Sequence, residues 1–234
     1  MLRAYLFFAA FIPLTLIFSV SSFISTLFDA SGRIHASHAR LWARLMLALN
    51  RVNVTVSGSE LLPEGSVIFM SNHQSNFDIL ALLAAMPRRF YWIAKKELFE
   101  IPLFGHSMRR GGYIPLDRSD GRKALQSLDE AAATIRQGKS VVLFPEGTRT
   151  TDGKLLPFKR GGFVLARKAD VPVIPVTING SGRINPANQF RLYSGDISIT
   201  IHPPVVFPSD LRRSEAETWM MEHVRKQIDS SLEH

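Results

Sequence analysis

The sequence predicts an α/β domain with a mixed, mostly parallel sheet flanked by helices, preceded by an N-terminal membrane-anchoring helical hairpin. Two observations support this prediction. From Val52 onward, short apolar runs typical of strands alternate with helical patterns, which favours a mostly parallel sheet. Before them, residues 4–28 contain no charged side chain, and at about 1.5 Å per residue this run is long enough to cross a bilayer core.

Residues 1–51 are predicted to form two membrane-associated helices. The first is the uncharged run Ala4–Phe28, for which a cleaved signal peptide is the alternative, and Pro13 leaves open whether it spans the bilayer or enters one leaflet. The second is Arg33–Asn50, which suits either the membrane interface or packing on the domain. Its basic stripe is Arg33, Ser37, Arg40 and Arg44, and its apolar stripe is Ile34, Leu41, Leu45 and Leu49.

Residues 52–231 are predicted to form the α/β domain, and residues 232–234 resemble the start of an affinity-tag scar. Apolar runs bounded by turn residues predict strands at Val52–Ser57, Val67–Met70, Phe90–Ala94, Tyr113–Leu116, Val141–Phe144, Val173–Ile178 and Asp196–Ile201. Helical periodicity predicts helices at Phe77–Met86, Arg122–Gln137 with Gly138 as its stop, and Gly161–Lys168, and a last helix to about Ile228 with Ser214 and Glu217 as its capping box.

Composition excludes several kinds of chemistry. The chain has no cysteine, so it has no disulfide framework, no thiolate zinc site and no cysteine nucleophile. A G-x-S-x-G motif is also missing, which leaves a serine acyl-enzyme of the α/β-hydrolase kind unsupported. The net charge of +8 and the pI near 10.1 indicate acidic partners, and the sequence contains no nucleic-acid-binding module.

The stretch Asn72–Asp78 places an imidazole and a carboxylate where an apolar strand gives way to a helix. Since five helical residues turn through about 500°, His73 and Asp78 do not share a face of one helix, so the turn falls between them. Asn76 is a favourable N-cap, which puts Asp78 in the first helical turn and leaves His73 free to fold back onto it. A histidine oriented by a carboxylate is a general base for a hydroxyl; the alternative is a loop in which both side chains cap backbone groups.

A second group of polar residues follows another apolar strand, in the segment Phe144–Thr150. Ligands bind at the carboxyl ends of strands in α/β sheets, so this loop occupies the same kind of position as the first. Gly147 allows close approach of the backbone, Thr148 offers a hydroxyl, and Arg149 offers a planar fork for phosphate. Glu146 suits a glycerol-like hydroxyl or pairs with Arg149, and the alternative is a polar turn with an internal Glu–Arg bridge.

Further cations follow strands or open a helix. Lys95, Lys96 and Arg118 come just after predicted strands, and Lys159 precedes a predicted helix. A single cation of this kind is usually a solvated surface charge. Several of them at strand ends beside a His–Asp pair indicate an anion pocket.

Four blocks in this order make the chain similar to the glycerolipid acyltransferase family, and in particular to its 1-acyl-sn-glycerol-3-phosphate acyltransferases. The blocks are Asn72–Asp78 with the H-x-x-x-x-D motif, Gly112–Arg118, Phe144–Thr150 and Val171–Val176, and Lys95–Leu98 and Ile101–Gly105 also resemble the family. The similarity covers about residues 50–205, with a core at about 66–180, and implies a glycerol-3-phosphate acyltransferase-like fold. Pro115 departs from the usually apolar residue of the second block, which puts the local strand pairing in doubt.

The resemblance implies that the protein transfers a fatty acyl group from a thioester to the 2-hydroxyl of lysophosphatidic acid, giving phosphatidic acid. His73 would take the hydroxyl proton, and Asp78 would fix its tautomer, without an acyl-enzyme. The residues expected to hold the glycerol phosphate are Arg118, Glu146, Gly147, Thr148 and Arg149, with Lys159 as an additional phosphate contact and Lys95 as a donor to the oxyanion or a contact to the acyl donor. No metal and no cofactor besides the acyl thioester are expected.

The expected partners are lysophosphatidic acid, anionic membrane lipids, and either acyl-carrier protein or a CoA thioester; nucleic acid is not expected. Arg33, Arg40 and Arg44 are expected to bind the anionic lipids, with the catalytic domain on the cytoplasmic side of the inner membrane. Other interpretations remain open at this point: acylation of another lysophospholipid, a serine-type lipase or thioesterase, and a non-catalytic lipid-binding protein with the same fold.

Overall fold

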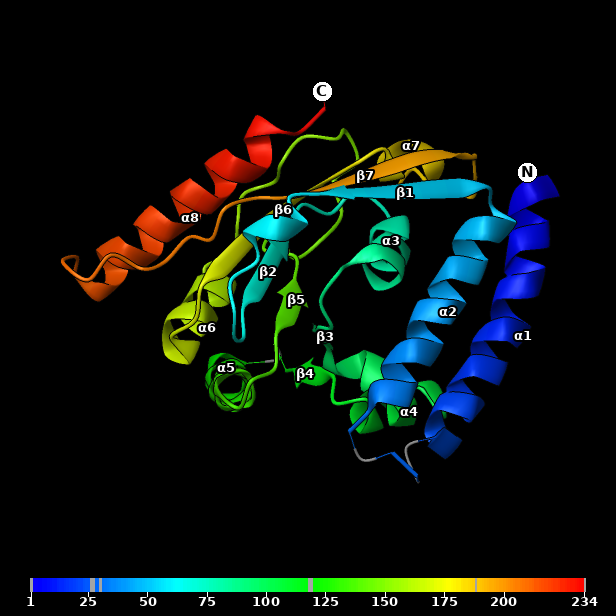
Figure 1. Cartoon of the computed structure of the whole chain (residues 1–234), viewed down its shortest axis with the longest axis horizontal. Coiled ribbons are helices and arrows are strands. Elements are labelled where there is room, and N and C mark those ends of the chain that lie inside the picture. Colours follow the sequence, from blue (N-terminus) through cyan, green and yellow to red (C-terminus); the bar gives the residue numbers. More distant parts are fainter. Residues whose placement is uncertain (1, 26–27, 30, 118–119, 188, 234) are drawn as a thin grey trace.

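A computed structural model describes residues 2–25, 28–29, 31–117, 120–187 and 189–233. These residues form one seven-stranded sheet in the order β1-β7-β6-β2-β5-β3-β4 (Figure 1). The strands are β1 (Val52–Ser57), β2 (Ile68–Ser71), β3 (Tyr91–Lys95), β4 (Ile114–Leu116), β5 (Val141–Leu143), β6 (Val173–Asn179) and β7 (Gly195–Ile201). Strands β6 and β7 run antiparallel, and the other neighbouring strands pair in parallel, which confirms the predicted mixed sheet.

Helices cover both faces of the sheet (Figure 1). They are α1 (Leu2–Ser25), α2 (Arg33–Leu49), α3 (Phe77–Ala85), α4 (Phe104–Arg110), α5 (Gly121–Arg136), α6 (Gly161–Ala169), α7 (Ser181–Ile184) and α8 (Arg213–Ser230), with short 3-10 helices η1 (Ser59–Leu61) and η2 (Lys96–Glu100). Ile68 and Met70 of β2 enter the core shared with α5, α6 and α8, and Phe69 enters the core shared with α2 and α3. Strand β2 is therefore buried on both faces, as parallel strands covered by helices are.

The first helix exposes apolar side chains along much of its length. Ser19 and Ser22 are buried against the rest of the chain, whereas Leu16, Ile17 and Ile24 are exposed. Helix α1 is long and apolar enough to cross a membrane, and its mean hydropathy reaches 2.1. An apolar outer face is unfavourable in water and favourable in hydrocarbon, so this helix indicates membrane association.

Helix α2 runs back along α1 (Figure 1). The indole N–H of Trp42 in α2 donates a hydrogen bond of 3.1 Å to the hydroxyl of Thr15 in α1, which joins the two helices. The predicted apolar stripe of α2, represented by Leu41 and Leu49, is exposed. The hairpin therefore presents apolar side chains outward from both helices.

Two arginines of α2 turn toward the domain. Arg40 donates from Nη2 to the carbonyl of Met86 at 2.7 Å, and Arg44 donates from Nε to the carbonyl of Ala84 at 3.3 Å. The last carbonyls of a helix lack partners within it and lie at the negative end of its dipole, so both cations stabilise the C-terminus of α3. These hydrogen bonds tie the hairpin to the helix that carries Asp78. The predicted contact of these arginines with anionic lipid stays a prediction.

Strand β4 lies at the edge of the sheet, although Pro115 falls within it. It pairs in parallel with β3, with Ile114 opposite Ile93 and Leu116 opposite Lys95. A proline lacks the backbone N–H that a central strand requires, but an edge strand tolerates it. The local pairing that Pro115 put in doubt is therefore present.

Residues 232 and 233 pack on the domain. Leu232 is buried in the core shared with α5, α6 and α8, and the backbone N–H of Glu233 donates to Asn179 Oδ1 at 3.0 Å. These contacts extend the ordered chain beyond the predicted end of the domain at residue 231. The interpretation of residues 232–234 as a tag scar stays a prediction.

The capping box predicted for the last helix is wrong. Helix α8 begins at Arg213, so Ser214 lies within it. The Glu215 carboxylate instead accepts a hydrogen bond of 3.3 Å from the backbone N–H of Arg212. The segment contains two acidic residues at suitable distances from the helix start, and the pattern alone does not choose between them.

Glu217, the residue assigned wrongly to that capping box, joins α8 to α6. Its buried carboxylate accepts hydrogen bonds from Arg160 Nε at 2.6 Å and Arg167 Nε at 2.8 Å. Burial acts to raise the pKa of Glu217, but the hydrogen bonds from Arg167 and Arg160 outweigh it and leave this pKa below its ordinary value. A lowered carboxyl pKa contributes stability that is present at neutral pH and is lost in acid.

We expect Glu217→Gln to lower the free energy of unfolding at pH 7 by about 1–3 kcal/mol, because it removes charged hydrogen bonds inside the protein. Denaturant unfolding in detergent measures this difference. As the pH falls below the ordinary carboxyl value of 4.5, the native glutamate protonates and the two proteins should converge in stability. A difference that persists unchanged in acid would contradict this role.

Candidate active site

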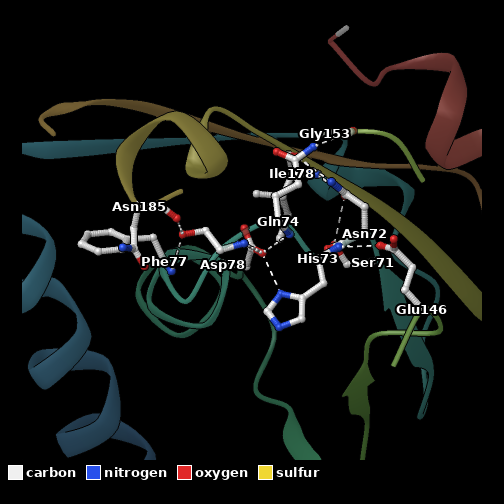
Figure 2. Close-up of polar contacts among 11 residues, drawn as sticks. Ser71, Asn72, His73, Gln74, Phe77, Asp78, Glu146, Gly153, Ile178 and Asn185 are labelled. Carbon is white, nitrogen blue, oxygen red and sulfur yellow. Dashed lines mark hydrogen bonds and ion pairs between the residues drawn. The ribbon is translucent and has the colours of Figure 1, made fainter. Parts of the chain in front are cut away.

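Strand β2 and helix α3 bring together the imidazole and the carboxylate predicted as a pair. Strand β2 ends at Ser71 and α3 begins at Phe77, so the chain turns between them. His73 Nδ1 lies 2.8 Å from Asp78 Oδ2 (Figure 2), which confirms the expected approach of the two side chains. Asp78 is fully buried and the imidazole is 14% exposed, with its second nitrogen directed away from the carboxylate.

The same carboxylate oxygen organises the turn. Asp78 Oδ2 also accepts hydrogen bonds of 2.8 Å from the backbone N–H groups of Gln74 and Ser75. Asn76 occupies the predicted N-cap position, but Ser75 Oγ accepts the N–H of the first residue of α3. Because Asp78 Oδ2 already accepts two backbone N–H groups, the tautomer that suits this contact carries its hydrogen on Nδ1 and leaves Nε2 as an acceptor.

Asn72 fixes the start of this turn to the neighbouring strand. Its amide donates to the carbonyl of Ile178 and accepts the N–H of the same residue, each at 2.8 Å (Figure 2). On the other side of the turn, the hydroxyl of Ser75 donates to the carbonyl of Asn185 at 3.0 Å. The sequence offers no signal for these partners, which lie more than a hundred residues further along the chain.

Glu146 holds the His73 loop from the side of β5. Its Oε1 accepts the backbone N–H of His73 at 2.8 Å (Figure 2). Its Oε2 accepts the backbone N–H of Leu156 at 2.8 Å. The backbone N–H of Thr150 donates to the carbonyl of His73 at 2.9 Å. The sequence predicted that Glu146 contacts the substrate or pairs with Arg149. The structure directs both carboxylate oxygens to backbone groups, which makes Glu146 a positioning residue of this loop. Its predicted contact with the substrate stays a prediction.

Burial raises the pKa of the Glu146 carboxyl above its ordinary value. The N–H groups of Leu156 and His73 act in the opposite direction, since they stabilise the charged form. These two hydrogen bonds therefore keep a buried carboxylate in place beneath the imidazole loop. Losing either one leaves the charge poorly compensated.

Aromatic stacking fixes the orientation of the imidazole ring. Phe144 lies flat against His73, with ring centroids 3.8 Å apart and planes within 6°. Trp92 stacks on Phe144 in turn, at 5.8 Å. The ring of His73 is thus held by a carboxylate at one nitrogen and by an aromatic face along its plane.

His73 borders a cavity of about 450 Å³. The loop after β5 contributes Gly147, Thr148 and Arg149 to its lining, and β3 contributes Lys95. Residues from three separate parts of the sequence therefore converge on one space, as expected for strands that end at the same edge of a sheet. Two cations and a hydroxyl beside a histidine base suit a phosphorylated alcohol.

The N-terminal hairpin also contributes to the lining of this cavity. Its contributions are Thr15, Phe18, Ser19, Ser22, His35, Ala39 and Trp42. The cavity extends to His35 and Tyr113, whose rings meet edge to face at 5.5 Å. Burial, together with the nearby charges of Arg89 and His38, lowers the pKa of His35 to about 4, so this end carries no charge on His35 at neutral pH.

Some predicted ligands stay untested. Arg118 falls outside the described residues, so its phosphate contact stays a prediction. Lys159 lies over Gly147, where an added Cβ would stand 2.9 Å from Lys159 Nζ. The φ of Gly147 is +73°, which favours glycine there. The predicted phosphate contact of Lys159 also stays a prediction.

Among the described residues, no group of three or more histidine or carboxylate side chains is arranged to hold a metal ion. That the reaction needs neither metal nor cofactor remains an expectation.

A known sequence family matches the part of the chain that forms this site. The Acyltransferase sequence family matches residues 53–179, which include most of the sheet and both loops of the site. The chain belongs to this acyltransferase family. The match covers the part of the chain that supplies His73, Asp78 and the loop after β5, and the N-terminal hairpin lies outside it.

Similar proteins carry a more specific name. A chloroplastic 1-acyl-sn-glycerol-3-phosphate acyltransferase of Brassica napus is 38% identical over 183 residues, or 76% of this chain and 53% of that protein. The chain thus spans about half the length of that plant relative. A 1-acyl-sn-glycerol-3-phosphate acyltransferase of Helicobacter pylori is 31% identical over 86% of this chain and 82% of its own.

A solved structure extends the likeness to nearly the whole acyltransferase chain. The crystal structure of the 1-acyl-sn-glycerophosphate acyltransferase PlsC from Thermotoga maritima has a TM-score of 0.81 and 26% identity. The match covers 98% of this chain and 94% of that one. It therefore extends over the hairpin as well as the α/β domain.

We expect Glu146→Gln to lower kcat for acyl transfer about 10-fold while leaving the acceptor KM within about twofold, because an amide oxygen replaces only one of two acceptors beneath the His73 loop. Steady-state kinetics of the purified full chain measure both constants. Glu222→Gln, an exposed change on α8, is the matched control. A raised acceptor KM with unchanged kcat would return Glu146 to the substrate contact that the sequence suggested.

Proposed function

We propose that this chain transfers a fatty acyl group from a thioester to the 2-hydroxyl of 1-acyl-sn-glycerol 3-phosphate and releases phosphatidic acid. The observation that carries the proposal is the pairing of His73 with Asp78 at 2.8 Å, beside a cavity also lined by Lys95 and Arg149. A base, a cationic wall and a deep apolar space meet the needs of a hydroxyl, a phosphate and an acyl chain. The names of the similar proteins support the same acceptor.

The proposed reaction has two steps. His73 Nε2 accepts the proton of the 2-hydroxyl while its oxygen attacks the thioester carbon, and Asp78 stabilises the resulting imidazolium through Nδ1. The tetrahedral intermediate then breaks its C–S bond, and the departing thiolate takes the proton from Nε2. A thiol has a pKa near 8.5, so its departure needs no stronger acid. His73 returns to its starting state, and no acyl-enzyme forms.

The phosphate and the oxyanion are assigned to separate cations. Arg149 offers two parallel N–H donors to the phosphate of the acceptor, with the hydroxyl of Thr148 beside it. Lys95, at the carboxyl end of β3, is the proposed donor to the oxyanion. By the family resemblance, Arg118 is also proposed to bind the glycerol phosphate, with Lys159 as an additional phosphate contact.

The apolar part of the cavity is proposed to hold an acyl chain. Its walls include Phe18 and Trp42 of the hairpin and Leu83 of α3, and His35 is uncharged at neutral pH. Helix α1 would keep this cavity at the bilayer, where the acceptor already holds its own chain. The net charge of +8 favours an anionic cytoplasmic leaflet and an acidic acyl donor, either acyl-carrier protein or a CoA thioester.

We expect His73→Ala to lower kcat about 10²- to 10⁴-fold, as loss of a general base does. The assay uses the purified full chain in mixed micelles, with lysophosphatidic acid and either thioester. His223→Ala is the matched control, because this histidine lies on α8 away from the cavity lining. Unchanged circular dichroism shows that each variant is folded, and near-normal transfer by His73→Ala would remove the mechanism.

The same assay tests the acceptor. Lysophosphatidic acid is expected to be acylated faster than lysolipids whose phosphate carries a choline or ethanolamine group. Faster acylation of one of those would change the acceptor and keep the chemistry. Release of free fatty acid at the same rate without any acceptor would mark a hydrolase and overturn the transfer.

A further inference from the structure

The segment between β3 and α4 exposes large apolar side chains beside the hairpin. Leu98 is 39% exposed, and Ile101 and Leu103 are each 45% exposed. Helix α4 packs against the end of α1 (Figure 1), where the rings of Phe23 and His106 meet edge to face at 6.1 Å. The segment therefore lies next to the last turns of the apolar helix α1.

The segment is anchored and tightly folded. Phe99 is buried, and the guanidinium of Arg109 lies 5.9 Å from the centre of its ring. The backbone N–H of Gly105 donates to the carbonyl of Ile101 at 2.8 Å, and a Cβ on Gly105 would stand 2.2 Å from the carbonyl oxygen of Phe99. Because Phe99 points inward, the turn that follows it presents Ile101 and Leu103 outward on a rigid support.

Leu103 has a strained backbone. Its φ is 61° and its ψ is −54°, and the N–H of Phe104 donates to the carbonyl of Pro102 at 2.6 Å, which closes a γ-turn around it. This conformation is rare for a residue with a branched side chain. Strain of this kind persists where the surrounding structure imposes it and concentrates at functional sites. A leucine held outward in this way gains nothing in water, but its burial in hydrocarbon is favourable.

Basic side chains lie at both ends of the segment. Lys96, which also pairs with Asp117 at 3.2 Å, precedes Leu98, and Arg109 and Arg110 end α4, against the carboxylates of Glu97 and Glu100. Lysine and arginine side chains reach the head groups while apolar neighbours enter the acyl region. The adjacent face of α1 already indicates membrane association, so a lipid surface is the occupant that both elements share.

We propose that Leu98, Ile101 and Leu103 insert into the same leaflet as α1 and form a second membrane contact of this protein. Leu98 and Phe104 also line the cavity beside His73. Insertion would therefore place one wall of the cavity against hydrocarbon. The insertion is independent of the proposed reaction, since it rests on the exposed apolar side chains, the nearby cations and the neighbouring helix α1.

The absence of native cysteine makes a direct test practical. Single variants Ile101→Cys and Leu103→Cys carry a polarity-sensitive fluorophore on the full chain, reconstituted in vesicles of phosphatidylcholine and phosphatidylglycerol. Leu125→Cys is the matched control, an exposed leucine on α5, on the opposite face of the sheet. Nitroxide-labelled lipid is expected to quench the fluorophores at 101 and 103 at least twofold more than the fluorophore at 125. Without the quencher, the emission of the fluorophores at 101 and 103 is expected to be blue-shifted relative to that at 125.

Two results would overturn the proposal. Quenching at 101 and 103 no greater than at 125 would show that this segment stays in water. Weak quenching together with an emission change on adding soluble acyl-carrier protein would assign the surface to a protein partner. The use of two positions separates insertion from any local disturbance at the strained Leu103.

Discussion

Asp78 lies fully buried in the first turn of α3, and its Oδ2 accepts hydrogen bonds from His73 Nδ1 and from the backbone N–H groups of Gln74 and Ser75. A buried carboxylate is unfavourable unless donors surround it, so the shape of the loop and the tautomer of the imidazole are set together. Glu146 restrains the same loop from β5. The proposed base is thus oriented by two buried carboxylates, one bound to its side chain and the other to its backbone.

The elements of the fold were predictable where they are long and apolar, and the pairing of His73 with Asp78 was predictable because it is local. One continuous helix would point His73 and Asp78 to different sides, so a helix that begins between them is what lets the two side chains meet. The role of Glu146 was not predictable, since its partners are backbone N–H groups that leave no mark in the sequence. Short helices such as α4 and η2 lack enough periodicity to stand out, and they bear the segment proposed to enter the membrane.

The role of the hairpin was also predictable only in part. Composition predicts that α1 associates with a membrane. It does not predict that α1 lines the cavity beside His73, because that depends on packing against distant parts of the chain. The hydrogen bonds from Arg40 and Arg44 to the last carbonyls of α3 were not predictable, because those carbonyls leave no mark in the sequence. The hairpin and the α/β domain are therefore joined at helix α3. The arginines of α2 bind its C-terminal carbonyls, and Asp78 in its first turn binds His73.

The orientation of His73 by Asp78 is tested most directly by nitrogen NMR of the histidine-labelled full chain in detergent micelles, with the His73 signals assigned through the His73→Gln variant. We expect the neutral imidazole to carry its hydrogen on Nδ1, with a downfield proton resonance that Asp78→Asn abolishes. A neutral His73 protonated on Nε2, or one whose signals do not respond to that substitution, would contradict the account.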